Sequence, residues 1–205
     1  MPGETPIVVV TGPPASGKTT IARAVADGAG VPLLAKDAIK EVLFDALETG
    51  DVAWSMRLGV ATYSLLYHLL EVQIAAGRSC VLEANFDTLL ASEELRGLQR
   101  RRPFRALQIA CEAAEDVLLE RYAGRAGRHP GHLDTARVDG VRESIRAARW
   151  RALDLDGETL VVDTTEWSAV DVRALVDRAR AWVSSPAKSA ISPGRSRGAQ
   201  KEPQP

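Results

Sequence analysis

The sequence predicts an α/β fold, in which a parallel sheet is covered by helices on both faces. Short apolar runs rich in β-branched residues alternate with longer helical segments over about residues 5–183. This alternation is typical of successive β-α-β units, whose strands run parallel. Apolar residues make up 45% of the 205 residues, which suffices for the core of one domain of ordinary size.

Five short segments have the composition of strands. The run 7–11 is uninterrupted and β-branched, as in a strand that is buried on both faces of a sheet. The other four expected strands are 31–37, 79–86, 104–111 and 159–165. Arg105 and Gln108 interrupt the apolar run of 104–111.

Seven segments between and after the strands have helical character. The expected helices are 19–27, 38–47, 52–76, 92–101, 114–123, 138–153 and 169–183. The first helix ends near Gly28 and Gly30, and Gly50 and Gly77 follow the second and third, since glycine commonly follows a helix C-terminus. Asp51 is a suitable N-cap for the long helix 52–76. The apolar positions of this helix that recur every three or four residues are Leu58, Ala61, Leu65, Leu69 and Val72.

We expect one domain over residues 1–183 and a disordered tail over 184–205, where proline, serine, glycine and charged residues predominate. The net charge is −1, so the total charge gives no reason to expect a polyanion or a membrane as a partner. No apolar run reaches the about 18 residues of a membrane helix, and residues 1–6 lack the pattern of a secretory signal. We therefore expect a cytoplasmic protein whose Cys80 and Cys111 are buried, reduced thiols.

A phosphate-binding motif follows the first expected strand. Gly12, Gly17, Lys18 and Thr19 match the pattern G-x-x-x-x-G-K-[ST] between a buried strand and a helix, which is the context that the motif requires. The glycines let main-chain N–H groups point inward as an anion nest at a helix N-terminus. Lys18 can then reach the β- and γ-phosphates, and the Thr19 hydroxyl can ligate Mg²⁺. The predicted nucleotide-binding residues of this loop are Gly12, Pro13, Pro14, Ala15, Ser16, Gly17, Lys18, Thr19 and Thr20.

This motif, an acid after the second strand, an arginine-rich loop and the segment "VDTT" at 162–165 together resemble the small P-loop kinases. That group includes adenylate kinase, gluconate kinase and the AAA_33, zeta-toxin and chloramphenicol-phosphotransferase-like proteins. The resemblance implies a P-loop NTPase three-layer sandwich, with five parallel strands in the order 2-3-1-4-5. It also implies an arginine-rich lid at about 124–138.

The acid after the second strand is Asp37, which we expect at the carboxyl edge of the sheet, where open α/β folds bind ligands. In several of the kinases that the chain resembles, an aspartate at this place orients or deprotonates the acceptor hydroxyl. A weak base suffices because the transition state of phosphoryl transfer is loose. The alternative is that Asp37 caps the helix 38–47, and the two roles are compatible.

The lid contains arginines and histidines around glycines. Arg121 and Arg125 are four residues apart and share one helix face. The resemblance implies that Arg121 stacks on the base of the nucleotide and that Arg125 stabilises the transferring phosphoryl group, with Arg128 as a second candidate. The alternative is a solvated basic loop. His132 is expected to contact the substrate or to shape the loop.

Other candidate residues lie on the third strand, the long helix and the last strand. Glu83 should face the phosphate-binding loop, where it could hold a Mg²⁺-bound water or a substrate hydroxyl, although capping the next turn is an equal alternative. Asn85 and Arg57 are candidate acceptor contacts. Thr164 is expected near the adenine, as the resemblance implies for the last strand.

We therefore expect an ATP- and Mg²⁺-dependent kinase that phosphorylates a hydroxyl of a small molecule, with Lys18, Asp37, Arg125 and Arg128 as its catalytic residues. The chain lacks the N/T-K-x-D motif by which GTPase switches read guanine. One alternative is an ATPase or nucleotide-binding regulator without an acceptor. Others are a toxin-like kinase of a nucleotide sugar and a kinase of nucleic-acid 5′-hydroxyls, although the near-neutral charge argues mildly against nucleic acid.

Overall fold

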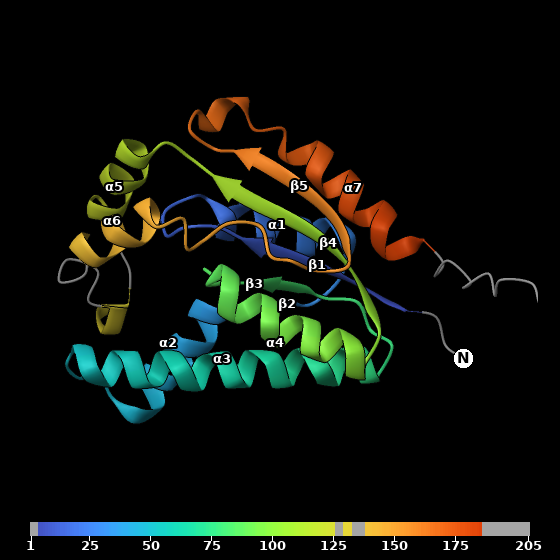
Figure 1. Cartoon of the computed structure of the whole chain (residues 1–205), viewed down its shortest axis with the longest axis horizontal. Coiled ribbons are helices and arrows are strands. Elements are labelled where there is room, and N and C mark those ends of the chain that lie inside the picture. The colour runs from blue at the N-terminus through green and yellow to red at the C-terminus, as the bar shows by residue number, and fades with distance from the viewer. Residues whose placement is uncertain (1–3, 126–128, 133–137, 186–205) are drawn as a thin grey trace, which may run out of the picture.

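The computed structural model describes residues 4–125, 129–132 and 138–185 (Figure 1). Its centre is a five-stranded parallel sheet in the order β2-β3-β1-β4-β5, which confirms the predicted fold class and strand order. The strands are β1 (Thr5–Thr11), β2 (Leu33–Ala35), β3 (Val81–Glu83), β4 (Phe104–Glu112) and β5 (Gly157–Asp163). The predicted tail beyond residue 185 lies outside the described residues, as do residues 126–128 and 133–137 of the predicted lid.

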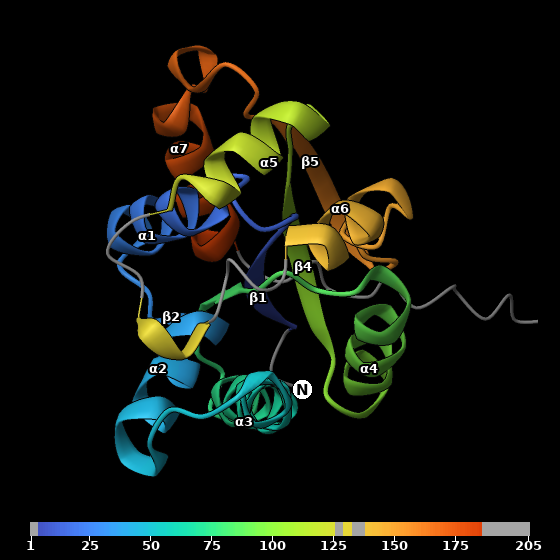
Figure 2. The ribbon, with the colours of Figure 1, turned by 90° about the vertical axis from the view of Figure 1, so that its left-hand side faces the viewer.

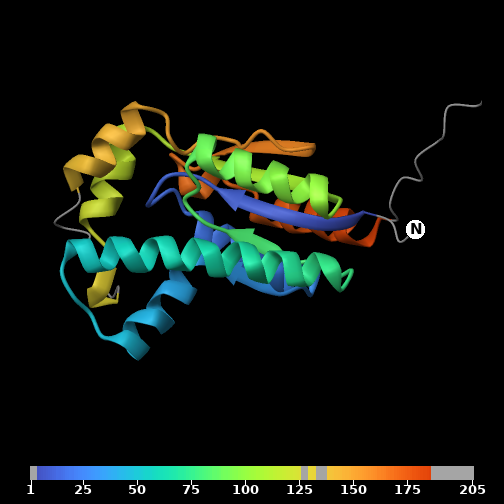
Figure 3. The ribbon, with the colours of Figure 1, turned by 60° about the horizontal axis from the view of Figure 1, so that its bottom comes forward.

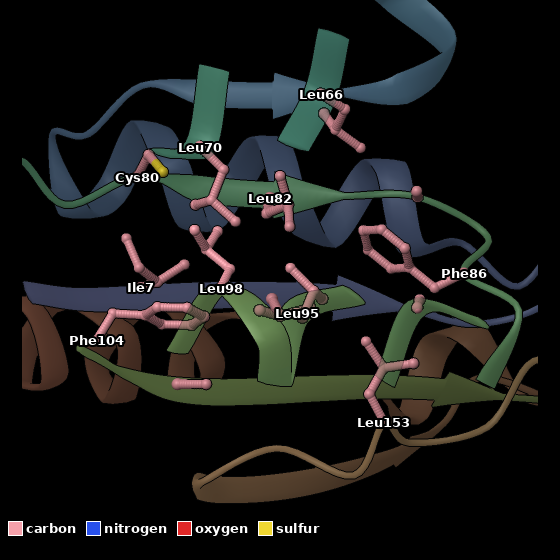
Figure 4. Packing of buried hydrophobic residues seen from close by; sticks show 14 of the residues in the cluster. Ile7, Leu66, Leu70, Cys80, Leu82, Phe86, Leu95, Leu98, Phe104 and Leu153 are labelled. Atoms are coloured by element: carbon pink, nitrogen blue, oxygen red, sulfur yellow. The ribbon is translucent and has the colours of Figure 1, made fainter. Parts of the chain in front are cut away.

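Two helices cover each face of the sheet, so the molecule has three layers. On one face lie α1 (Lys18–Ala29) and α7 (Val172–Ser184), and on the other lie α3 (Val52–Ala75) and α4 (Thr88–Arg101). Successive side chains of β1 point to opposite faces, so Val8 faces α1 while Ile7 faces α3 and α4. Figure 4 shows the second core, in which the labelled side chains of α3 and α4 meet those of the strands. The uninterrupted apolar run of β1 is explained by these two cores.

The remaining helices lie toward the carboxyl ends of the strands (Figures 1 and 2). They are α2 (Lys36–Leu47), α5 (Glu115–Ala123) and α6 (Val138–Arg146). There are also two short 3₁₀ helices. One, η1 (Pro130–His132), comes after α5, and the other, η3 (Trp167–Ala169), comes after β5. Because parallel strands end at one edge, this edge gathers the loops that could carry a site.

The predicted apolar stripe of α3 is wrong in all but one position. Leu58 is buried, whereas Ala61 and the predicted leucines and valine that follow it are exposed. The buried face instead consists of Ser55, Leu58, Thr62, Leu66, Leu70 and Ile74. Two of these are polar, and their hydroxyl groups bond to backbone carbonyls, Thr62 to Leu58 and Ser55 to Gly131. The apolar residues at the predicted positions therefore lie beside the buried face, which includes two polar residues.

The predicted helix 138–153 is also too long, because α6 ends at Arg146. Ala148 has φ +52°, a left-handed conformation that a right-handed helix cannot contain. The predicted N-cap of α3 is confirmed, since the Asp51 carboxylate accepts a hydrogen bond from the Trp54 amide. Within the part of the chain that the structure describes, no helix has both the length and the apolar character to cross a membrane.

Candidate active site

The loop between β1 and α1 has the backbone of an anion-binding nest. Gly12 has φ +146°, and a Cβ there would lie 2.4 Å from the carbonyl oxygen of Cys111. Gly17 has φ +75°, and a Cβ there would lie 2.6 Å from the Trp167 ring, so both positions require glycine. Ala15 also takes a positive φ, +69°, which is strained for a residue with a side chain. This strain at the centre of the motif supports a loop shaped for its ligand.

Three side chains meet where this loop faces the end of β3. The ammonium group of Lys18 lies 3.7 Å from Oε1 of Glu83, and the Thr19 hydroxyl donates to the same oxygen at 3.3 Å. Glu83 is 2% exposed, and burial raises the pKa of its carboxyl above the ordinary value, although the Lys18 charge opposes that shift. The other carboxylate oxygen, Oε2, is buried and has no hydrogen-bond partner among the described residues.

This arrangement fits a magnesium ion. An orphaned carboxylate oxygen beside a threonine hydroxyl supplies the hard oxygen ligands that Mg²⁺ prefers, directly or through its water molecules. The Ser16 hydroxyl, in the loop itself, is likewise buried without a hydrogen-bond partner among the described residues. Such orphaned groups are costly in a finished interior and are expected where a ligand completes the site.

Asp37 belongs to the first turn of α2 and not to the end of β2. The N-cap of α2 is Ala35, which makes no side-chain cap, so the alternative role of Asp37 as an N-cap is wrong. Its carboxylate lies 3.0 Å from the Lys36 ammonium group and remains partly exposed. Lys18 and Asp37 both line a cavity of about 430 Å³. The structure thus brings the phosphate loop and the predicted base to one hollow.

The same cavity includes several residues that the sequence analysis did not single out. Among them are Lys36, Lys40, Tyr122, Arg149 and Trp150, next to the predicted Asn85, Arg125 and His132. Lys36 and Lys40 could have been recognised, because they flank Asp37 within one turn of the same helix, and cations commonly accompany phosphate chemistry. Nothing in the sequence pointed to Arg149 and Trp150, because they lie beyond Arg146, in the part of the predicted helix 138–153 that is not helical.

The η1 segment of the predicted lid rests on α2. The rings of His129 and Phe44 stack at 5.2 Å, and His132 places Nε2 2.8 Å from the Glu41 carboxylate. Gly131 lies so close to Phe44 that a Cβ would come within 2.6 Å of the ring. Its carbonyl accepts from the Ser55 hydroxyl, which in turn accepts from the buried ammonium group of Lys40. These contacts hold residues 129–132 against α2 and α3 at the edge of the cavity, which His132 lines.

Arg121 and Thr164 build the wall beside the phosphate loop. The Arg121 guanidinium donates to the carbonyl oxygens of Thr164 and Thr165 at 2.9 and 2.8 Å. The Thr164 hydroxyl is fully buried and donates to the carbonyl oxygens of Ser16 and Glu112. Arg121 and Arg125 line a hollow of about 280 Å³ over the phosphate loop. Arg121 therefore lies beside the phosphate loop, and its stacking on a nucleotide base stays a prediction, while the Thr164 side chain holds the loop to the sheet.

Several predicted residues do not line this cavity of about 430 Å³, among them Glu83 and Arg121, which lie beside the phosphate loop, and Arg57. Arg57 is exposed and lies with its guanidinium carbon 5.2 Å from the centre of the Trp54 ring, and it is absent from the described lining. Arg128 lies outside the described residues. Asn85 does line the cavity, and its carbonyl accepts from the Tyr63 hydroxyl at 2.8 Å.

Comparison with known proteins gives a family match and several relatives. A family model described as an AAA domain matches residues 7–148. A solved structure from Chloroflexus aurantiacus j-10-fl, provisionally called a kinase, is 41% identical with a TM-score of 0.79, and the match covers 87% of this chain and 99% of that one. The structure of a sugar kinase from Janibacter sp. HTCC2649 is 20% identical with a TM-score of 0.53, and the match covers 88% of this chain and 94% of that one. At this identity the match shows a shared fold alone.

A curated relative is an uncharacterised protein of Mycobacterium tuberculosis (strain ATCC 25618 / H37Rv). It is 25% identical over 151 residues, which are 70% of this chain and 30% of that protein. The chain thus spans less than a third of the length of that relative.

Proposed function

Because this chain belongs to the AAA domain family, whose model matches residues 7–148, and has a P-loop kinase fold, we propose that it transfers the γ-phosphoryl group of ATP to a hydroxyl of a small molecule. The observation that carries this proposal is the cavity of about 430 Å³ that Lys18 and Asp37 line together. A nucleotide-binding protein without an acceptor has no need of a second, partly enclosed hollow beside the phosphate loop.

The residues around the cavity have separate tasks in this proposal. The acceptor oxygen attacks the γ-phosphorus, the bond from that phosphorus to the β-phosphate oxygen breaks, and the acceptor proton passes to the Asp37 carboxylate. Lys18 and Arg125 stabilise the charge on the transferring oxygens, because both are cations that line the hollow. Arg128 is proposed for the same task from its place in the sequence alone.

Thr19 and Glu83 would hold Mg²⁺, which when bound neutralises charge on the β- and γ-phosphates. Arg121 fixes the wall against which the base would lie, through its two bonds to backbone carbonyls. The contacts of η1 with α2 would exclude water from the hollow while both substrates are bound. Exclusion of water matters because water would otherwise accept the phosphoryl group.

A direct test measures ADP release from ATP and Mg²⁺ in the presence of nucleosides, sugars, amino sugars and other hydroxyl compounds. We expect at least one acceptor to raise ADP release well above the acceptor-free rate, with its phosphorylated product detected by mass spectrometry. ADP release that no acceptor changes would support an ATPase or regulator instead. The absence of any Mg²⁺-dependent affinity for a nucleoside triphosphate would overturn the proposal entirely.

A further inference from the structure

A second, larger cavity is lined by residues of α3 and α4. These two helices cover the face of the sheet opposite to α1, and Figure 3 shows them along one side of the sheet. The volume of this cavity is about 850 Å³, and we call it the α3–α4 groove. Four residues line both this groove and the hollow that contains Asp37: Asn85, Ser144, Arg149 and Trp150. The two cavities therefore adjoin, and a molecule whose hydroxyl reaches Asp37 can extend into the groove.

The rings of Tyr63 and Tyr67 line the α3–α4 groove, and the ring of Phe86, which does not line it, packs against both. The Tyr63 and Tyr67 rings lie 6.1 Å apart, and Phe86, which is fully buried, lies 6.1 and 6.4 Å from them. The Tyr63 hydroxyl is fixed by its bond to the Asn85 carbonyl. Burial raises the pKa of both phenols, so they remain neutral at physiological pH. Such a rigid, neutral platform suits stacking against a sugar ring or contact with a cation.

The two adjoining cavities differ in charge. Among the described lining residues, the hollow at Asp37 has five lysines and arginines against two carboxylates. The α3–α4 groove has four carboxylates, those of Glu71, Asp87, Glu93 and Glu94, against two arginines. An anionic phosphoryl group is thus favoured at one end of the combined site and a cationic group at the other.

Two of the groove carboxylates already have cationic partners. Asp87 pairs with Arg149 at 2.6 Å, and Glu71 pairs with Arg102 at 3.5 Å. Glu93 and Glu94 make no ion pair with any residue that the structure describes. Glu94 and Tyr67 both line the groove, and the charge of Glu94 contributes to the raised pKa of the Tyr67 phenol. A carboxylate beside an aromatic face is a favourable setting for an ammonium group.

We propose that the α3–α4 groove binds the distal part of the phosphoryl acceptor and that this acceptor is a hydroxylated amine, such as an amino sugar, whose ammonium group lies against Tyr67 and Glu94. The inference rests on the proposed kinase function, since it assigns the substrate class of the same site. It adds a specificity determinant outside the reacting groups. The cavity is large enough for the distal part of the acceptor, and the aromatic rings provide a surface on which it can pack. The difference in charge between the two cavities orients the ammonium group away from the phosphoryl group.

The test compares amino sugars with their N-acetylated counterparts, which keep the hydroxyl groups but lose the charge. Glucosamine, galactosamine and kanamycin serve as probes, each beside its N-acetylated form. Turnover is measured by ADP release and binding by calorimetry, on the wild type and on the Glu94→Lys variant. Asp27→Lys is the matched control, because Asp27 is an exposed acid of α1 that lines neither cavity.

We expect the wild type to bind at least one of the amines more tightly than its N-acetylated form. In Glu94→Lys the KM and Kd for that amine should rise on the order of tenfold with kcat little changed, since a close charge pair is reversed. Asp27→Lys should leave these values unchanged. Equal affinity for amines and their N-acetylated forms, or an equal effect of Glu94→Lys on both, would overturn the inference.

The calorimetric measurement separates this inference from the proposed function. Charge-dependent binding of an amine without any ADP release would support the groove as a binding site and contradict the kinase reaction. Turnover of neutral hydroxyl compounds alone would support the kinase and contradict the assignment of the amine. Failure of both measurements would overturn both proposals.

Discussion

The carboxylate of Glu83, at the end of β3, lies 3.7 Å from the ammonium group of Lys18, at the start of α1. Both side chains are almost fully buried, so each offsets part of the charge of the other. A triphosphate would offer Lys18 a second anionic partner. The two residues therefore link the stability of the fold to the binding site, and the first two predictions use this link.

Lys18→Met is expected to lower kcat/KM by about 10²- to 10³-fold, because one cationic contact to the transferring phosphoryl group is lost. It should also lower the free energy of unfolding by about 1–3 kcal/mol, since Glu83 stays buried without its cation. The double variant with Glu83→Gln should recover stability in urea unfolding but not activity. Near-normal turnover in Lys18→Met would contradict the role of this lysine.

Glu83→Gln alone is expected to raise the Mg²⁺ concentration for half-maximal activity by about 10- to 100-fold, as for groups that support a metal site. The reason is that the orphaned carboxylate oxygen and its charge are removed. Glu112→Gln is the matched control, because Glu112 ends β4 and is exposed. The measurement is a Mg²⁺ titration at fixed ATP. An unchanged midpoint would show that Glu83 does not serve the metal.

Asp37→Asn is expected to lower kcat by about 10²-fold or more at saturating acceptor, because the base that receives the acceptor proton is lost. Asp116→Asn is the matched control, because Asp116 lies in the first turn of α5 as Asp37 lies in the first turn of α2. It tests whether losing an acid from a first helical turn is by itself sufficient to lower kcat. Steady-state kinetics on both variants give the comparison. If Asp37→Asn retains near-normal kcat, the proposed role as a base is incorrect.

Gly131→Ala is expected to weaken the docking of η1 on α2, because its Cβ would lie 2.6 Å from the Phe44 ring. We expect a several-fold higher ratio of ATP hydrolysis to phosphoryl transfer, as water enters the hollow. Adding Phe44→Leu should restore part of the ratio by making room. Gly59→Ala is the control, since its Cβ would make only an ordinary contact, 3.8 Å from Lys40. An unchanged ratio in Gly131→Ala would argue against a lid.

Burial raises the pKa of the Cys80 and Cys111 thiols to about 12 from 9.0. Both should stay protonated at pH 8, and neither should react with iodoacetamide until the protein is unfolded, as mass spectrometry would show. The unfolded chain releases these protons near pH 9, whereas the folded chain holds them. Stability should therefore fall as the pH rises from 9 toward 12, by up to about 1.4 kcal/mol per thiol and pH unit.

Removal of the thiols offers the matched comparison for that pH profile. In the double variant Cys80→Ala, Cys111→Ala, the free energy of unfolding should decline less steeply between pH 9 and 10 than in the wild type. The small voids left by the two substitutions lower that free energy at every pH, so only the slope is compared. Rapid alkylation of the folded wild type at pH 8 would contradict the burial of these side chains.

The predicted site residues differ in how far the sequence could locate them. Gly12, Gly17, Lys18 and Thr19 are local in sequence, and their spacing alone encodes the turn and the helix start that the structure contains. For Arg57 the sequence indicates only that it belongs to the long helix; in the structure it does not line the hollow, and its guanidinium lies over the Trp54 ring. A helix predicts which residues share a face but not which face meets a distant element.

The sequence by itself determined the parallel sheet, its strand order through the resemblance, and the phosphate loop. The strands and the phosphate loop follow from local composition and from one short motif, each within a few consecutive residues, whereas the strand order follows only from the family that the sequence resembles. The predicted strand order already placed Glu83 toward the phosphate loop, but only the tertiary structure decided that its carboxylate lies beside the Lys18 ammonium group. Only the tertiary structure decided, too, that Gly131 rests on Phe44 and that an acidic groove adjoins the basic hollow. Those relationships depend on how α2, α3 and α4 pack, and packing is set by complementary surfaces of segments that are remote in the chain.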